Sequence, residues 1–270
     1  MKLPLPRVYR RKFGAIRLKR FVGMIYKLLQ EEQKHFDVLL VGGNSGLMMG
    51  RITQEIFDKL NVKRPPLIAI PFVKCKPERE GSIRNFIGIF QDEIRDQIGN
   101  INFKDFKNVL FVDDEIGDGC TADVCMEALL KATGTDSKLV NYYIVAEDHG
   151  FKASNIKSVN AIYYPFARKN IDVNNIISYC IPAVIDQQIR KVLPNDLYHA
   201  KRRFNVLLDL PSRDKKQLFS NYNYQLNEKV RQNISNIEEL KTDFQIFLSK
   251  LISNGIEEYK KGKINFKNDK

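Results

Sequence analysis

Two adjacent acidic residues, Asp113 and Asp114, follow the apolar run Val109–Val112 and precede a turn that contains Gly117 and Gly119. A short apolar run is typical of a buried strand, and a helical pattern begins directly after the turn. In an open parallel sheet, ligands bind beyond the carboxyl ends of the strands, where the first amides of a helix attract anions. Carboxylates at that position can bind sugar hydroxyls or a divalent cation. The segment therefore predicts a binding site for a phosphorylated sugar.

The sequence from Val109 to Thr121, VLFVDDEIGDGCT, resembles the signature of type I phosphoribosyltransferases. In that signature, four apolar residues precede two acids, two apolar residues and a Thr/Ser-rich turn with glycine. The resemblance implies that Asp113 and Asp114 bind the ribose hydroxyls of phosphoribosyl pyrophosphate, directly or through Mg²⁺. It also implies that the turn binds the 5-phosphate, through Gly117, Asp118, Gly119, Cys120 and Thr121. We count Glu115 among the catalytic residues, because Glu115 or Asp118 could assist proton transfer.

The turn departs from the family pattern at three positions. Glu115 stands where an apolar residue is usual, Gly117 where a small or acidic residue is usual, and Asp118 where threonine is usual. A carboxylate that points at a phosphate costs on the order of 1 kcal/mol at 4 Å in water, and several-fold more where solvent is excluded. Either the Asp118 carboxylate points away from the turn, or the ligand differs.

Two further segments resemble the same family. The segment DVLLVGGNSGLMMGRITQEIF resembles its first strand and pyrophosphate-binding turn, with the turn residues Gly43, Asn44, Ser45 and Gly46. The cationic loop with Lys74, Lys76 and Arg79 stands where the family has a loop that closes over pyrophosphate. Both segments also have plainer interpretations, since glycine turns often connect a strand to a helix and charged loops are common on surfaces.

The elements that must position these residues alternate between strand and helix patterns. The predicted strands are 37–41, 66–73, 109–112, 139–145 and 161–164, with helices at 46–60 and 121–133 and an earlier helix at about 15–33. This alternation predicts an α/β fold: a doubly wound, mostly parallel five-stranded sheet like that of type I phosphoribosyltransferases. A long polar insertion, with room for a hairpin or a short helix, separates the second and third strands.

We expect three parts along the chain. Residues 1–14 are rich in arginine and lysine, contain no acid, and have two early prolines that disfavour helix, which predicts a basic arm. Residues 15–184 form the phosphoribosyltransferase-like domain. Residues 185–270 have no strand–helix alternation and form a C-terminal helical appendage.

The composition indicates which partners, metal sites and cellular locations can be expected for this protein. The net charge of +12 favours anionic partners such as nucleotides, and the basic arm could also contact nucleic acid, although a solvated arm or a subunit contact is the plainer interpretation. The four cysteines and three histidines form no metal-binding signature. No apolar run is long enough for a membrane span or a secretory signal, so we expect a soluble cytoplasmic protein. The sequence leaves a homodimer open.

These observations lead to two principal hypotheses. The first is a transferase that moves phosphoribosyl from phosphoribosyl pyrophosphate to a nucleobase or a related nitrogen compound, with Mg²⁺ and release of pyrophosphate. The second is a non-catalytic regulatory protein that keeps the fold and binds a nucleotide or nucleic acid. A hydrolase or phosphotransferase for another sugar phosphate is a third hypothesis. His149 and the aromatic segment 163–167 could line a base pocket, but packing and loop roles are more usual for such residues.

Overall fold

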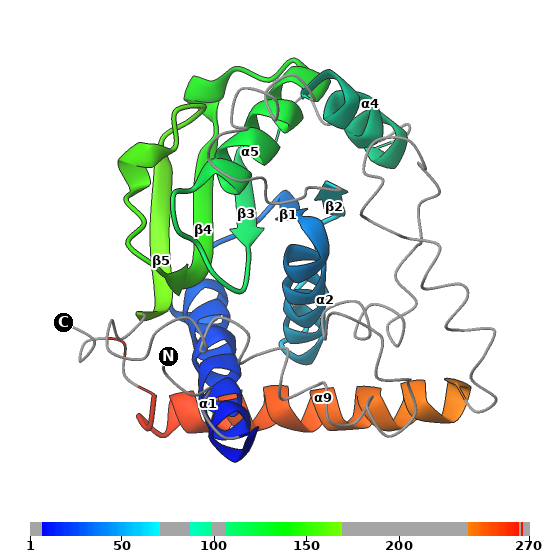
Figure 1. Cartoon of the computed structure of the whole chain (residues 1–270), viewed down its shortest axis with the longest axis vertical. Coiled ribbons are helices and arrows are strands. Elements are labelled where there is room, and N and C mark those ends of the chain that lie inside the picture. Colours follow the sequence, from blue (N-terminus) through cyan, green and yellow to red (C-terminus); the bar gives the residue numbers. More distant parts are fainter. Residues whose placement is uncertain (1–6, 71–86, 99–105, 169–236, 265, 267–270) are drawn as a thin grey trace, which may run out of the picture. The chain divides into compact units, whose positions relative to one another are not determined.

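The computed structural model of the chain describes residues 7–70, 87–98, 106–168, 237–264 and 266, and it contains two compact units. Unit 1 combines residues 1–23 with residues 169–268, and unit 2 consists of residues 24–168 and the last two residues. Figure 1 shows the elements of both units, each of which is described by itself below.

Unit 2 contains a five-stranded sheet in which every strand is parallel to its neighbours. The strands are β1 (Val38–Gly42), β2 (Leu67–Ile70), β3 (Asn108–Val112), β4 (Asn141–Asp148) and β5 (Ala161–Arg168), in the spatial order β2-β1-β3-β4-β5. All five predicted strands are therefore confirmed as strands. They form because short apolar runs such as Val38–Val41, which is fully buried, suit a sheet covered on both faces. The sheet confirms an α/β fold.

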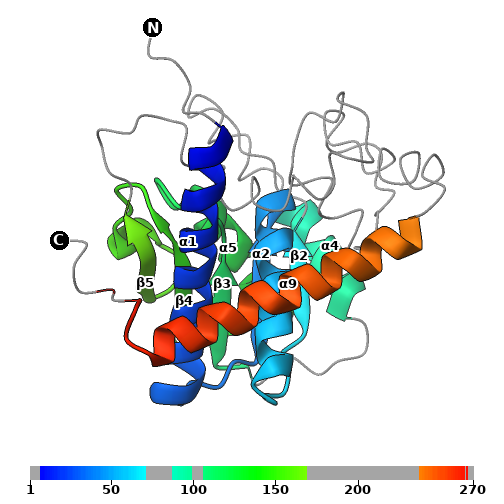
Figure 2. The same cartoon turned by 90° about the horizontal axis from the view of Figure 1, so that it is seen from below.

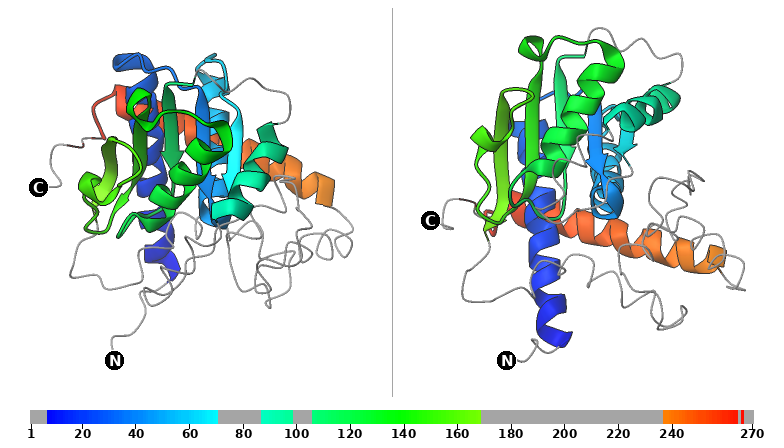
Figure 3. Two further views of the ribbon diagram at one scale, coloured as in Figure 1. Left: turned by 90° about the horizontal axis from the view of Figure 1, so that it is seen from above. Right: turned by 45° about the horizontal axis from the view of Figure 1, so that its top comes forward.

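Helices cover both faces of this sheet (Figure 3). The helix α2 (Gly43–Lys59) packs on β1 and β2, whereas α4 (Ile87–Ile98) and α5 (Cys120–Thr133) pack on each other on the opposite face. The helix α4 lies in the predicted insertion, so its later part is helical rather than a hairpin. Short helical turns connect other elements: η1 (Lys27–Glu31), η3 (Ser137–Leu139) and η4 (Ala153–Asn155).

Two glycines let α2 approach the sheet closely. A Cβ at Gly46 would lie 3.2 Å from the Cβ of Val41, and a Cβ at Gly50 would lie 2.9 Å from the Cγ1 of the same valine. Larger side chains at these positions would push the helix away from β1. This packing fixes the start of α2 at the carboxyl end of β1.

The described part of unit 1 consists of α1 (Arg7–Tyr26), which continues into unit 2 after Gly23, and α9 (Ile237–Lys260). The prediction of a helix from residue 15 to residue 33 was wrong at its start, because α1 begins at Arg7. A proline disfavours helix at preceding positions but not at following ones, so Pro4 and Pro6 do not prevent helix from Arg7 onwards. Residues 7–14 of the expected basic arm thus belong to α1. No helix among the described residues is long and apolar enough to cross a membrane.

Candidate functional site

The strand order places the two predicted ligand-binding segments next to each other. β1 pairs with β3, with Leu40 opposite Phe111, so the carboxyl ends of these two strands are neighbours. The chain leaves β1 towards β2 on one side, and β3 lies on the other side, so the direction of winding reverses between β1 and β3. Ligands of open α/β sheets bind at such a reversal, beyond the carboxyl ends of the strands. We take this edge of the sheet as the candidate site.

The segment after β1 is the first turn of a helix rather than a loop. Gly43 has φ 66°, a left-handed conformation that favours glycine, and α2 begins at this residue. Asn44 and Ser45 are therefore helical, and Gly46 packs on Val41. The prediction of a turn over Gly43–Gly46 was wrong, because these residues already belong to α2 and a single glycine suffices to redirect the chain. What remains at this position is a helix N-terminus, whose first amides can bind an anion.

The expected cationic loop cannot be placed at the site. Lys74, Lys76 and Arg79 lie outside the described residues. Their contact with pyrophosphate stays a prediction.

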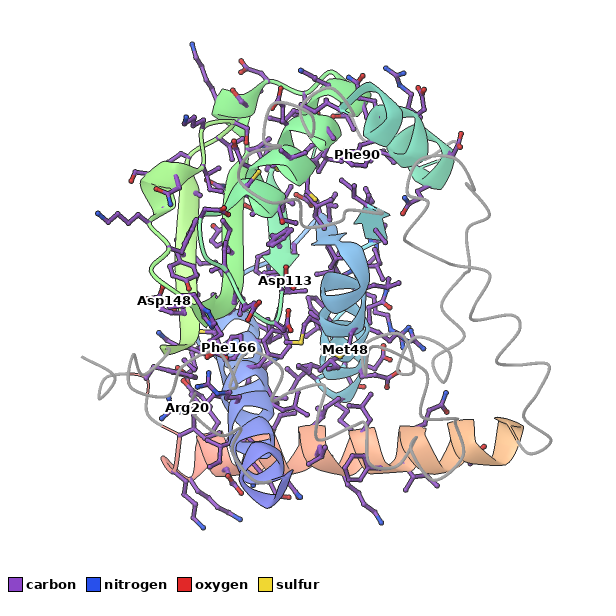
Figure 4. The ribbon with its side chains drawn as sticks, in the orientation of Figure 1. Arg20, Met48, Phe90, Asp113, Asp148 and Phe166 are labelled. Atoms are coloured by element: carbon purple, nitrogen blue, oxygen red, sulfur yellow. The ribbon has the colours of Figure 1, made fainter. Side chains whose placement is uncertain are left out.

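The paired acids Asp113 and Asp114 are both buried directly after β3. Their exposed fractions are 9% and 3%. The amide of Asp113 donates to the carbonyl oxygen of Val145 at 3.2 Å, and the amide of Asp114 donates to Oδ1 of Asp113 at 2.8 Å. Figure 4 shows Asp113 at the end of β3. The sequence correctly placed these carboxylates at a strand end. Their burial argues against the alternative that they are simply a solvent-exposed strand terminus.

Asp113 acts electrostatically on the α5 side of the sheet. Burial raises the pKa of the Cys125 thiol, and the negative charge of Asp113 raises it further. Burial also raises the pKa of Tyr142, with smaller contributions from Cys125, Asp123 and Asp113. Cys125 belongs to α5, and the hydroxyl of Tyr142 donates to the carbonyl oxygen of Ala122 in the same helix at 2.9 Å.

A histidine lies between two glutamates at the same edge. The amide of Ile116 donates to the carbonyl oxygen of Glu147 at 2.9 Å, so the chain after Asp114 runs alongside the end of β4. Nε2 of His149 lies 3.5 Å from Oε1 of Glu147 and 3.9 Å from Oε2 of Glu115. The sequence identified Glu115 as a candidate but did not pair it with His149 or Glu147. Glu147 belongs to β4 and His149 directly follows this strand, so their closeness in the sequence was the available signal.

The turn before α5 requires glycine at only one of its two glycine positions. Gly119 has φ 83°, and a Cβ there would lie 2.5 Å from Cε2 of Phe151. A Cβ at Gly117 would meet no atom within 4 Å. Gly119 is therefore needed for the local structure, whereas the space beside Gly117 is open to a ligand.

The Asp118 carboxylate lies at the N-terminus of α5. Its Oδ1 accepts from the amide of Cys120 at 3.0 Å, and its backbone carbonyl accepts from Nδ2 of Asn155 at 3.0 Å. The carboxylate therefore accepts from the first amide of α5, which was expected to bind a phosphate. One amide of the expected phosphate site, that of Cys120, is thus already bound to this carboxylate.

The connection between β4 and β5 is fastened to this turn. Asp123, which is buried in the first turn of α5, accepts from the amides of Lys157 and Ser158, both at 2.9 Å. Oδ1 of Asp148 accepts from the amides of Gly150 and Phe151 at 2.9 and 3.0 Å. These contacts hold Phe151 under the turn. Sequence reasoning missed Asp123, because nothing local distinguishes it from a solvated helix residue.

The aromatic residues of β5 have packing roles. Tyr163 meets Phe151 edge to face, with 4.7 Å between the ring centroids, and Phe166 is fully buried. The hydroxyl of Tyr164 donates to Glu32 at 2.9 Å. Burial, together with this hydrogen bond and the charge of Glu32, raises the pKa of Tyr164 to about 12. These contacts support the packing interpretation of the segment 163–167.

The residues of the candidate site could supply only some of the ligands that a divalent cation needs. No group of three or more His, Cys, Asp or Glu residues in the described part of the chain is arranged to hold a metal ion. Mg²⁺ commonly uses one or two carboxylates together with substrate phosphates and water. Asp113 and Asp114 could supply the two carboxylates of such a set.

A separate open groove of about 640 Å³ runs along the C-terminal half of α5. Its lining includes Asp123, Glu127, Lys131, Asp136 and Lys157, but none of the predicted ligand-binding residues. Several of these charges are already engaged: Nζ of Lys131 donates to Glu127 at 2.7 Å, and Asp136 accepts from the amide of Lys138 at 3.0 Å. We therefore do not assign the ligand to this groove.

Comparisons with models of protein families, with curated proteins and with solved structures found no match to this chain.

Proposed function

We propose that the chain binds phosphoribosyl pyrophosphate, or a closely related ribose phosphate, and transfers the phosphoribosyl group to a nitrogen acceptor. One observation carries this proposal: the predicted pyrophosphate and ribose phosphate segments follow neighbouring strands at the point where the sheet reverses its winding. Two helix N-termini and two buried acids therefore meet at one edge. Such an edge offers donors for two phosphate groups and acceptors for the sugar hydroxyls between them.

Each part of the ligand has an assigned partner in this proposal. The carboxylates of Asp113 and Asp114 accept from the ribose hydroxyls. They could also bind a Mg²⁺ ion together with the pyrophosphate. This ion would supply positive charge that helps to neutralise the departing pyrophosphate. The first amides of α5 bind the 5-phosphate, and the first amides of α2 bind pyrophosphate. The open space beside Gly117 admits the 5-phosphate to the turn.

The reaction would need positioning and charge stabilisation more than a covalent nucleophile. The lone pair of the acceptor nitrogen attacks C1 of the ribose as the bond from C1 to the pyrophosphate oxygen breaks. Pyrophosphate leaves with the electron pair of that bond, and the acceptor nitrogen loses a proton. We assign Glu115 as the proton acceptor, because its carboxylate lies beside His149 at the same edge.

A second candidate function is a non-catalytic regulatory protein that binds a nucleotide at this edge. The position of Asp118 favours it, because a carboxylate already accepts from an amide of the expected phosphate site. The two functions share the binding step and differ in turnover.

Titration and turnover measurements separate these functions. Binding of phosphoribosyl pyrophosphate would be followed by calorimetry with Mg²⁺, and pyrophosphate release would be measured with a panel of purine and pyrimidine bases. We expect binding, with release that depends on one of the bases. Binding without release would support the regulatory protein, and release without any base would indicate a hydrolase. Absence of both binding and release would overturn the proposal.

Replacing Asp118 with Asn is expected to strengthen the binding of ribose 5-phosphate about fivefold or more. An asparagine oxygen can still accept from the amide of Cys120, so the helix start is kept, whereas removal of the charge removes about 1 kcal/mol or more of repulsion from the phosphate. Calorimetric titration of both proteins would measure the change.

Asp136 provides a matched control for this substitution. Its side chain caps a helical turn in the same way, by accepting from the amide of Lys138. The change Asp136→Asn removes the same charge outside the candidate site and should leave the affinity for ribose 5-phosphate unchanged. Equal gains from both substitutions would mean that only the net charge of the protein matters.

A further inference from the structure

The backbone brings Glu115, Glu147 and His149 together at the candidate site. β3 and β4 lie side by side (Figure 2), and the chain after β3 continues along the end of β4. Ile116 forms an isolated parallel bridge with Asp148. The amide of Ile116 donates to the carbonyl oxygen of Glu147, and its carbonyl oxygen accepts from the amide of His149, both at 2.9 Å. Glu115, the residue before this bridge, is therefore held beside the two residues that flank Asp148.

The side chains of these three residues meet at one atom, Nε2 of His149. This nitrogen lies 3.5 Å from Oε1 of Glu147 and 3.9 Å from Oε2 of Glu115. N–H···O hydrogen bonds are shorter, at about 2.7–3.2 Å, so the attraction is mainly electrostatic. The side chains are 3% exposed for Glu147, 14% for His149 and 23% for Glu115, and shielding from water strengthens such an attraction. The imidazole thus links a buried carboxylate to one that reaches solvent.

Glu115 needs such a link because of the residues that precede it. It is the third of three consecutive acids, after Asp113 and Asp114, and like charges so close to one another repel. A glutamate side chain also has several rotamers, and holding its carboxylate in one place removes that freedom. A protonated imidazole offsets the repulsion and favours the rotamer in which the carboxylate lies beside it.

We propose that His149 is a positioning residue that holds the carboxylate of Glu115, and that Glu147 orients the imidazole. This role rests on the proposed function, in which Glu115 accepts the proton of the acceptor nitrogen. A base must lie within hydrogen-bond reach of that proton, and a further side chain commonly orients it. Glu147 suits the last place in this series, because it belongs to β4 and is buried. His149 itself does not contact the reacting atoms.

The change His149→Ala is expected to lower kcat for pyrophosphate release about tenfold and to leave KM within about twofold, because a displaced base loses only part of its contribution to proton transfer. His149→Gln should retain most of kcat, since the glutamine amide can donate near the position of Nε2. In a Glu115→Gln protein, His149→Ala should change kcat by less than about twofold, because no charged carboxylate remains to be held. Steady-state release of pyrophosphate from these proteins measures the effects.

Two further variants control for loss of the fold and for loss of a histidine elsewhere. His149→Ala removes a neighbour of the buried Glu147, so circular dichroism must show that this variant is folded. Glu147→Gln keeps the size of that side chain and adds no charge, so the fold should persist, while the less well oriented imidazole lowers kcat about threefold. This loss should also disappear in the Glu115→Gln protein. His35→Ala removes an exposed histidine outside the site and should leave kcat and KM unchanged.

Urea unfolding tests the contact between Glu115 and His149 without any need for turnover. The unfolding equilibrium constants of Glu115→Gln, His149→Ala and the double variant are each compared with that of the unchanged protein. Because groups in contact are coupled, the loss in the double variant should be smaller than the product of the two single losses, by about threefold or more. A double loss equal to that product would overturn the proposal.

The kinetic measurements contain their own contrary results. A loss of kcat that persists when His149→Ala is made in the Glu115→Gln protein would overturn the positioning role. A rise in KM at unchanged kcat would overturn it as well, since His149 would then act in ligand binding. Absence of pyrophosphate release from the unchanged protein would instead overturn the transferase function, and the unfolding measurements alone would then decide whether His149 holds Glu115.

Discussion

Replacing Asp113 with Asn is expected to lower the rate of pyrophosphate release by about 10²–10³, while the protein stays folded. In the proposed function, this carboxylate binds the ribose and stabilises the positive charge that develops as pyrophosphate leaves. Removal of one such preorganised group commonly costs about 3–4 kcal/mol in the transition state. The structure makes the substitution conservative, because an asparagine oxygen can still accept from the amide of Asp114. Steady-state release of pyrophosphate, with the most active base of the panel, measures the loss.

The control for this substitution is Asp148→Asn. Asp148 ends β4 at the same edge of the sheet, and its Oδ1 accepts from the amides of Gly150 and Phe151. Asparagine preserves these bonds and removes one negative charge nearby, so the rate should change less than twofold to threefold. A similar loss of rate in both variants would show that the rate depends on the total negative charge at this edge of the sheet and not on Asp113 specifically. An active Asp113→Asn enzyme would exclude the role assigned to this residue.

Replacing Gly119 with Ala is expected to reduce the free energy of unfolding by about 3 kcal/mol. The left-handed backbone at φ 83° costs an alanine about 1–2 kcal/mol, and the new Cβ would lie 2.5 Å from Cε2 of Phe151, an overlap that costs about 1–3 kcal/mol. Phe151 cannot move freely, because its amide donates to Asp148 and its ring packs against Tyr163. For a domain of this size, the melting temperature should fall by about 6–12 °C. Urea unfolding followed by circular dichroism measures the change.

Gly117→Ala is the matched control, two residues away in the same turn. A Cβ there meets no atom within 4 Å and the backbone is not left-handed, so the free energy of unfolding should change by less than about 0.5 kcal/mol. Equal destabilisation by both substitutions would contradict the contact between Gly119 and Phe151.

The fold class followed from short-range patterns in the sequence. Val38–Val41 and Val109–Val112 are apolar at every position, as expected for strands covered on both faces, and a helical period follows each of them, in the second case after a turn. Five strands were predicted, and the part of the chain that the structure describes contains five parallel strands. The boundaries were less accurate, as α1 begins at Arg7 rather than near residue 15. Arginine and lysine are good helix formers, so a polar segment after Pro6 can be helical without an apolar stripe.

The sequence also identified several residues of the candidate site. Asp113 and Asp114 stand between a strand and a glycine turn. The end of a strand, where ligands of parallel sheets bind, can be recognised from the residues on either side of it. Gly43 and Gly119 both have the left-handed backbone that glycine permits. These features are local, because they depend on the conformations of a few neighbouring residues.

Only the tertiary structure decided how the site is assembled. The neighbouring positions of β1 and β3 depend on strand order, and no local pattern encodes this order. The bonds from Lys157 and Ser158 to Asp123 join residues more than 30 positions apart, as does the contact between Gly119 and Phe151. The direction of the Asp118 carboxylate depends on the fold of its turn, which Asn155 holds from the β4–β5 connection. Local periodicity reports which face of an element is buried, whereas contacts distant in sequence form only when the whole sheet closes around them.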